Sequence, residues 1–122
     1  MTKTIMIVDD SASTRQLVNI VLSGAGYEVI ECSEGKDALN KLIGQKVHLI
    51  ISDVNMPIMD GITFVKAVRK LPEHKFVPIV MLSMGLVRSS REQAREAGVK
   101  AWITKPFDKP QLLDAVSRFA LP

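Results

Sequence analysis

Ile5-Met6-Ile7-Val8 is the stretch that decides the fold, because its four apolar residues follow one another without alternation. A strand with one solvated face alternates apolar and polar residues, whereas a strand buried on both faces reads as an apolar run. Two further runs are Ile79–Leu82 and Val47–Ile51, the latter interrupted only by His48, and shorter ones are Val29–Ile30 and Trp102–Ile103. These runs predict five short strands in a sheet that is covered on both faces.

Helical spacing of apolar residues separates these runs. The periodic positions are Leu17, Ile20 and Val21; Ala38, Leu39 and Leu42; Phe64, Val65 and Val68; and Leu112, Val116 and Phe119. A fourth helix is expected between Ser89 and Ala97, where only the two alanines are apolar, so it should bury little surface. Ser13 with Gln16 fits a capping box at the start of the first helix. Alternating strands and helices predict an α/β fold: a doubly wound, five-stranded parallel sheet, order 2-1-3-4-5, flanked by five helices.

Length and composition restrict the class of protein. The 122 residues suit one domain, expected to span 1–122, and 47% hydrophobic with 24% charged residues is ordinary for a globular chain. Cys32 is the only cysteine, which excludes an intramolecular disulfide. No apolar run approaches the roughly 20 residues of a membrane span, and no signal peptide is evident, so we expect a cytoplasmic protein.

The positive charge is concentrated in one segment. The formal net charge is +3; residues 88–118 hold seven basic and four acidic side chains, and the remainder holds nine of each. A basic chain can bind nucleic acid, but no aromatic residue is interleaved with the bases of residues 88–100. We therefore expect no nucleic-acid partner, and interpret the segment as a solvated face or a protein-docking face.

Polar residues with chemical potential stand where the predicted strands end. Asp9 and Asp10 follow the first strand, Asp53 the third, Ser83 closes the fourth, and Lys105 follows the fifth. The carboxyl ends of parallel strands meet at one edge of a doubly wound sheet, which is where such sheets bind ligands. These five side chains are therefore predicted to converge.

Converging carboxylates need a compensating cation. At an effective dielectric constant near 20, two like charges ~4 Å apart repel by roughly 4 kcal/mol. An all-oxygen set suits Mg²⁺, for which Mn²⁺ can substitute, and the absence of nearby histidine or cysteine disfavours zinc. A carboxylate nucleophile between a metal ion and a lysine is suited to phosphoryl transfer that yields an acyl phosphate.

Three segments resemble the receiver domain of two-component response regulators, in order and spacing: Ile5–Ser11, Asp53–Gly61 and Thr104–Phe107. The resemblance covers essentially the whole chain. The stretches Ser11–Arg15 and Ala101–Ile103 look most like the single-domain chemotaxis regulators of the CheY type.

The resemblance implies roles for the acidic residues. Asp53 matches the phosphoacceptor. Asp10 matches the direct Mg²⁺ ligand, Asp9 a residue that acts largely through water, and Asn55 the position whose backbone carbonyl completes the metal shell. We accordingly expect Asp9, Asp10, Asp53 and Asn55 to form the metal site.

The resemblance also implies a switch. Ser83 matches the hydroxyl that moves to the phosphoryl group and Lys105 its ion-pair partner; Trp102 matches an aromatic residue, usually smaller, that turns inward on activation. The Lys105–Pro106 bond matches one that is cis in the family.

The expected function is that of a single-domain response regulator. A sensor histidine kinase, of chemotaxis type by resemblance, would phosphorylate Asp53 with Mg²⁺. Output would be protein docking, for example at a flagellar switch component, and the chain would be a phosphoacceptor, with only self-catalysed phosphotransfer and slow autodephosphorylation.

Three alternatives remain open at this point. The chain could be a phosphorelay shuttle, a small-molecule phosphohydrolase or phosphotransferase, or a pseudo-receiver that binds partners without phosphorylation. Met84 motivates the last, because the family usually has a small residue there. Gly85 also departs from a commonly polar position, which leaves phosphoryl lifetime open, and Leu86 and Val87 could either pack under the fourth helix or form an exposed docking spot.

Overall fold

The five apolar runs form five parallel strands, as the sequence predicts. The computed structural model describes residues 2–84 and 88–120, apart from the side chains of 88–90. The sheet has the order β2-β1-β3-β4-β5 and all its pairings are parallel, which confirms the predicted topology. Its strands are β1 (Thr4–Val8), β2 (Glu28–Cys32), β3 (Leu49–Asp53), β4 (Ile79–Ser83) and β5 (Ala101–Thr104).

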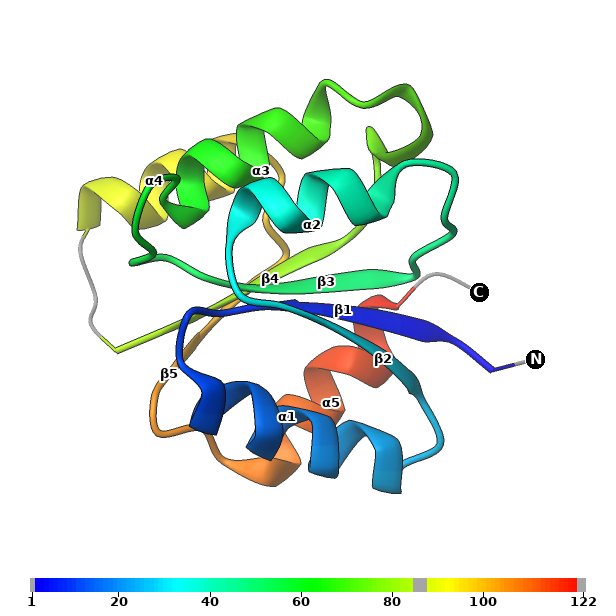
Figure 1. Cartoon of the computed structure of the whole chain (residues 1–122). Coiled ribbons are helices and arrows are strands. Elements are labelled where there is room, and N and C mark those ends of the chain that lie inside the picture. Colours follow the sequence, from blue (N-terminus) through cyan, green and yellow to red (C-terminus); the bar gives the residue numbers. More distant parts are fainter. Residues whose placement is uncertain (1, 85–87, 121–122) are drawn as a thin grey trace.

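The helices cover both faces of the sheet, as Figure 1 shows. One face carries α1 (Ala12–Gly24) and α5 (Lys109–Phe119). The other carries α2 (Gly35–Leu42), α3 (Gly61–Arg69) and α4 (Arg88–Glu96). A short 3₁₀ helix, Pro72–His74, lies between α3 and β4. No helix within the described ranges is long and apolar enough to cross a bilayer.

The two faces of the sheet build two separate hydrophobic cores. Met6 and Val8 of β1 pack in a cluster with residues of α2, α3 and α4, whereas Ile5 and Ile7 pack in a cluster with residues of α1 and α5. All four side chains are buried. Because successive strand residues point to opposite faces, a sheet with a core on each side requires apolar residues at every position, which explains the continuous run.

The first helix begins earlier than the capping pattern predicts. The N-cap residue is Ser11, whose hydroxyl accepts a hydrogen bond from the Thr14 N–H at 3.3 Å, and Ser13 lies inside the helix. The prediction of Ser13 as the cap was therefore wrong. The cause is local: the Ser11 N–H donates to Asp9 Oδ1 at 2.9 Å, so the chain already turns at the end of β1.

The fourth helix buries little, as expected. Among the described side chains of α4, only Ala94 is buried. Ala97, Val99 and Trp102 complete its partly buried contact with the core. Met84 begins the connection from β4, whereas Gly85, Leu86 and Val87 lie outside the described residues, so the alternatives for that segment stay untested.

Candidate functional site

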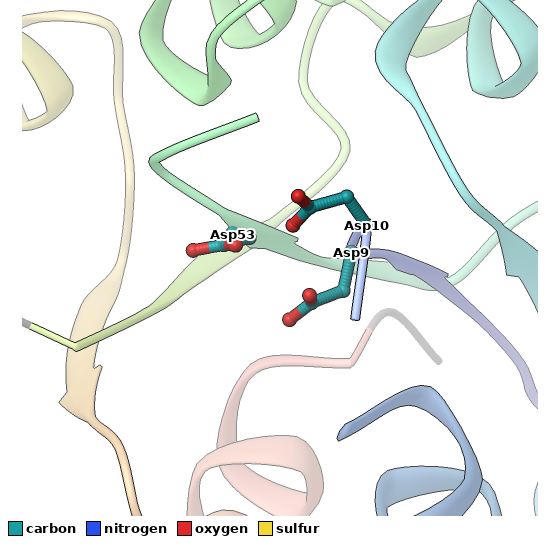
Figure 2. Close-up of side chains that lie close together, drawn as sticks. All are labelled: Asp9, Asp10 and Asp53. Atoms are coloured by element: carbon teal, nitrogen blue, oxygen red, sulfur yellow. The ribbon is translucent and has the colours of Figure 1, made fainter. Parts of the chain in front are cut away.

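Three carboxylates meet where β1 and β3 end side by side. Asp9 and Asp10 follow β1 and Asp53 is the last residue of β3; one carboxylate oxygen from each lies within 4.8 Å of the others. Figure 2 shows the three side chains gathered at this edge of the sheet. Asp9 and Asp53 are buried, whereas Asp10 is exposed. The predicted convergence of these three residues is therefore observed, with Asp10 on the solvent side.

Backbone donors fix the two buried carboxylates. Asp53 Oδ1 accepts a hydrogen bond from the Val54 N–H at 2.8 Å, and Asp9 Oδ1 accepts the bond from Ser11. The Asp9 N–H in turn donates to the Cys32 carbonyl at 3.1 Å, at the end of β2. The hydrogen bonds between β1 and β2 thus continue as far as Asp9, and together with the two backbone donors they fix the Asp9 and Asp53 carboxylates.

Lys105 is the cation of this cluster. Its Nζ lies 2.8 Å from Asp9 Oδ2 and 3.4 Å from Asp53 Oδ2, and its side chain is only 11% exposed. The Lys105 N–H donates to the Ser83 carbonyl at 2.7 Å, which ties the end of β5 to the end of β4. The Lys105–Pro106 peptide bond is cis, as the resemblance implied.

The charges in the pocket shift one another's protonation. Burial raises the pKa of Asp53, the charge of Asp9 raises it further, and Lys105 and the Val54 N–H only partly oppose this. Burial alone would lower the pKa of Lys105, but its hydrogen bond to Asp9 and the charges of Asp9 and Asp53 raise it overall. Asp53 is therefore a carboxylate that gains from an additional nearby cation.

The remaining predicted residues occupy the surroundings of the cluster. Ser83 is buried at the end of β4, beside Thr104 of β5, and Asn55 is exposed two residues beyond Asp53. Trp102 is half-buried against the core under α4, and its indole N–H is buried with no hydrogen-bond partner among the described residues. The Met84 side chain is 77% exposed.

Sequence reasoning missed a second cation beside the acidic turn. The guanidinium of Arg15, on α1, donates to the Asp9 carbonyl at 2.6 Å and forms an ion pair with Glu31 of β2 at 3.4 Å. Asn19 holds the other Glu31 oxygen at 2.7 Å. Arg15 therefore orients the peptide that joins Asp9 to Asp10. The only available signal was an arginine one turn beyond the acidic pair, because Glu31 is adjacent in space only once β2 pairs with β1.

The loop after β3 packs tightly onto the backbone of Asp53. The Gly61 N–H donates to the Val54 carbonyl at 2.7 Å, and a Cβ at Gly61 would overlap the Asp53 carbonyl oxygen. Within the same loop, Ile58 has φ +70° and is 88% exposed, an unusual conformation for a β-branched residue. Residue 61 therefore has to be glycine, because any side chain would overlap the Asp53 backbone. The positive φ of Ile58, in contrast, is not compensated by burial of its side chain.

The donor set fits a hard divalent cation. Three carboxylates on one open edge, with Asp10 facing solvent, leave room for the water ligands that Mg²⁺ retains. The acidic cluster is consistent with a receiver Mg²⁺ site.

The fold and site together define a class of protein: a doubly wound domain with an acidic, lysine-bridged pocket at the point where the strand order reverses. The sequence model of the response regulator receiver domain matches residues 5–117. The structure is similar to that of the chemotaxis protein CheY4 of Vibrio cholerae, with 40% identity, coverage of 98% and 99% of the two chains, and a TM-score of 0.93.

Two more distant likenesses agree. A response regulator structure from Chloroflexus aurantiacus is 34% identical, covers 98% of both chains and has a TM-score of 0.91. The polar-differentiation response regulator DivK of Brucella abortus is 26% identical over 98% of this chain and 97% of its own. The chain belongs to the response regulator receiver family, whose members are phosphoacceptor signalling proteins.

Proposed function

We propose that this chain is a single-domain response regulator, 1–122, that takes a phosphoryl group from a sensor histidine kinase onto Asp53. The observation that carries the proposal is the position of that carboxylate. Asp53 is held by the Val54 N–H, lies 3.4 Å from Lys105 and shares a cluster with Asp9 and Asp10. A buried carboxylate with a cation on one side and an open acidic site on the other is suited to becoming an acyl phosphate.

Asp9, Asp10, Asp53 and the backbone carbonyl of Asn55 would hold Mg²⁺. The bound ion would neutralise charge on the transferred oxygens. A receiver domain of the same fold, from the histidine kinase PA1611 of Pseudomonas aeruginosa, has a magnesium ion coordinated in its active-site cleft. The three carboxylates of this chain offer the oxygen ligands that Mg²⁺ prefers.

The transfer step balances without another reactant. A carboxylate oxygen of Asp53 attacks the phosphorus of a phosphohistidine whose second ring nitrogen carries a proton. The new O–P bond forms as the N–P bond breaks, and the ring leaves with the N–P electron pair as neutral imidazole. Lys105 already lies against Asp53, so its ammonium is placed to pair with a phosphoryl oxygen. Ser83, at the end of the neighbouring β4, would donate its hydroxyl to another.

The consequence of phosphorylation would be a population shift. As Ser83 and Lys105 turn to the phosphoryl group, Trp102 and α4 repack, which alters the face formed by α4, β5 and α5. The buried indole N–H of Trp102 has no hydrogen-bond partner among the described residues, which supports this role, because an unsatisfied buried donor is costly. Output is then docking of a protein partner.

We propose chemotaxis as the pathway, with a flagellar switch component as the docking partner and a cytoplasmic location. The similarity to CheY4, named a chemotaxis protein, supports this. DivK, named for polar differentiation, is less similar in sequence.

The test is intact mass after incubation with Mg²⁺ and a small acyl phosphate or amidophosphate. We expect one phosphoryl adduct on the wild type and none on Asp53→Asn. If neither gains mass, beryllium fluoride with Trp102 fluorescence is the second measurement, and no response to either would favour the pseudo-receiver. Release of free phosphate from small metabolites would favour a phosphohydrolase. Onward transfer to a histidine phosphotransfer domain would favour a shuttle.

A further inference from the structure

A basic groove with an exposed aromatic residue lies between α3 and α4, away from the acidic pocket. Its volume is about 660 Å³, and its walls are the C-terminal halves of the two helices and the turn that precedes β4. Four cations and one carboxylate line it, together with Phe76. The lining side chains with these charges are Lys66, Arg69, Lys70, Lys75 and Glu96.

The groove carries more positive than negative charge. Its excess of three positive charges equals the formal net charge of the whole chain. Of the five charged lining residues, only Glu96 comes from residues 88–118, in which the sequence concentrates its bases. No carboxylate within the described ranges forms a salt bridge with Lys66, Lys70 or Lys75. Three lysines are therefore available to anions from outside.

Phe76 supplies an apolar anchor in the same groove. Its side chain is 83% exposed, and the Lys75 ammonium lies 5.7 Å from the ring centroid. The ring contributes to neither core. Protein interfaces typically combine an aromatic anchor with surrounding charged residues.

Hydrogen bonds of Arg69 and Lys66 link the elements that surround the groove. Arg69 donates to the Ala97 carbonyl at 2.8 Å and to the Val77 carbonyl at 2.6 Å, which joins the end of α4 to the start of β4 through α3. Across the walls, Lys66 Nζ lies 3.5 Å from Gln93 Oε1. A surface held in this way needs little reordering when a partner binds.

We propose that this α3–α4 groove docks an acidic segment of another protein, with carboxylates paired to the three lysines and an apolar side chain against Phe76. A concave surface between two helices suits a polypeptide better than a flat bilayer. Single-stranded nucleic acid is expected to need several stacking rings, whereas the groove offers one. The groove borders the α4–β5–α5 face at α4, but its three lysines and Phe76 lie on α3 and in the segment between α3 and β4.

The experiment uses a short glutamate-rich peptide with a central leucine, titrated into ¹⁵N-labelled protein. We expect amide shifts confined to residues 66–76 and 93–98, and no response to the peptide in which glutamine replaces glutamate. Phe76→Ser should weaken binding roughly fivefold and Lys70→Glu roughly tenfold.

Matched controls lie on the opposite layer. Ile20→Ser removes an exposed apolar residue from α1, and Lys109→Glu reverses an exposed charge at the start of α5. Both should leave the affinity unchanged. The proposal is overturned if Lys109→Glu weakens binding as much as Lys70→Glu does, since the attraction is then non-specific. It is also overturned if an oligonucleotide or anionic vesicles displace the peptide at equal charge concentration, or if the shifts lie outside the groove.

Discussion

Replacing Arg15 with lysine should weaken Mg²⁺ binding while leaving the net charge unchanged. The guanidinium serves two groups at once, the Asp9 carbonyl at 2.6 Å and Glu31 at 3.4 Å, and its side chain is 18% exposed. A lysine presents one compact ammonium and cannot reproduce this fork. The change therefore removes about one charge-assisted hydrogen bond, which is worth roughly 1.5–3 kcal/mol where little water can replace it.

Part of that loss should appear in metal affinity, because Arg15 orients the peptide between two of the carboxylates. Residues that orient metal ligands typically change affinity by about 10–100-fold, and we expect the lower end, since Asp9 keeps its bonds to Ser11 and Cys32. Removing the charge altogether would confuse the result, because one fewer cation near the site favours Mg²⁺. Lysine avoids that ambiguity.

The assay is calorimetric Mg²⁺ titration beside urea unfolding. Arg118→Lys is the control, since its ion pair with Asp114 is 65% and 63% exposed and should contribute at most about 0.5 kcal/mol. The positioning role predicts that saturating Mg²⁺ restores phosphorylation of Asp53 in Arg15→Lys. Unchanged Mg²⁺ affinity in that variant, with stability lowered, would reduce Arg15 to a structural residue and refute the reasoning.

Four further outcomes are expected. Mg²⁺ at a hundred times its dissociation constant should stabilise the fold by about 2.7 kcal/mol, and an unchanged melting temperature would exclude the metal site. Because folding raises the pKa of Asp53, its contribution to stability is present in acid and lost as pH rises through the folded pKa. Without Mg²⁺, Asp53→Asn should therefore be more resistant to urea than the wild type at neutral pH but not at acidic pH. An equal gain in stability at both pH values would contradict this. Gly61→Ala should destabilise by about 1–3 kcal/mol or more, because its Cβ would displace the Asp53 backbone, and a neutral result in unfolding would show that the loop yields. Ile58→Asn should stabilise by about 1 kcal/mol by relieving a positive φ, unless denaturation shows no gain.

The fold could be predicted from the sequence because the signals that specify it are local. The run Ile5-Met6-Ile7-Val8 predicts a strand that is buried on both faces, and the structure has a hydrophobic core on each side of β1. The proximity of Asp9, Asp10 and Asp53 could be predicted because the carboxyl ends of parallel strands meet at one edge of a sheet. The start of the first helix was predicted wrongly because the Ser11 N–H donates to Asp9 Oδ1, a contact that depends on the direction of the Asp9 side chain.

The contacts that sequence could not supply are those between residues distant along the chain. Arg15 and Glu31 form a pair only because β2 lies beside β1, and Arg69 reaches Ala97 across two elements. The basic groove has the same origin. Counted along the sequence, the charge excess falls after residue 88, yet Lys66, Lys70 and Lys75 gather against α4 in space.

Lys105 connects the resting geometry to the expected chemistry. With one ammonium 2.8 Å from Asp9 and 3.4 Å from Asp53, the pocket holds an internal cation that is favoured by both carboxylates. A divalent cation bound to the same carboxylates would reduce their attraction for Lys105, since each carboxylate would then be neutralised from two sides. The ammonium would thus be loosened at the moment when a phosphoryl group on Asp53 offers it new oxygens. A metal ion and Lys105 would therefore compete for the same carboxylates, and metal binding would free the lysine to pair with a phosphoryl oxygen.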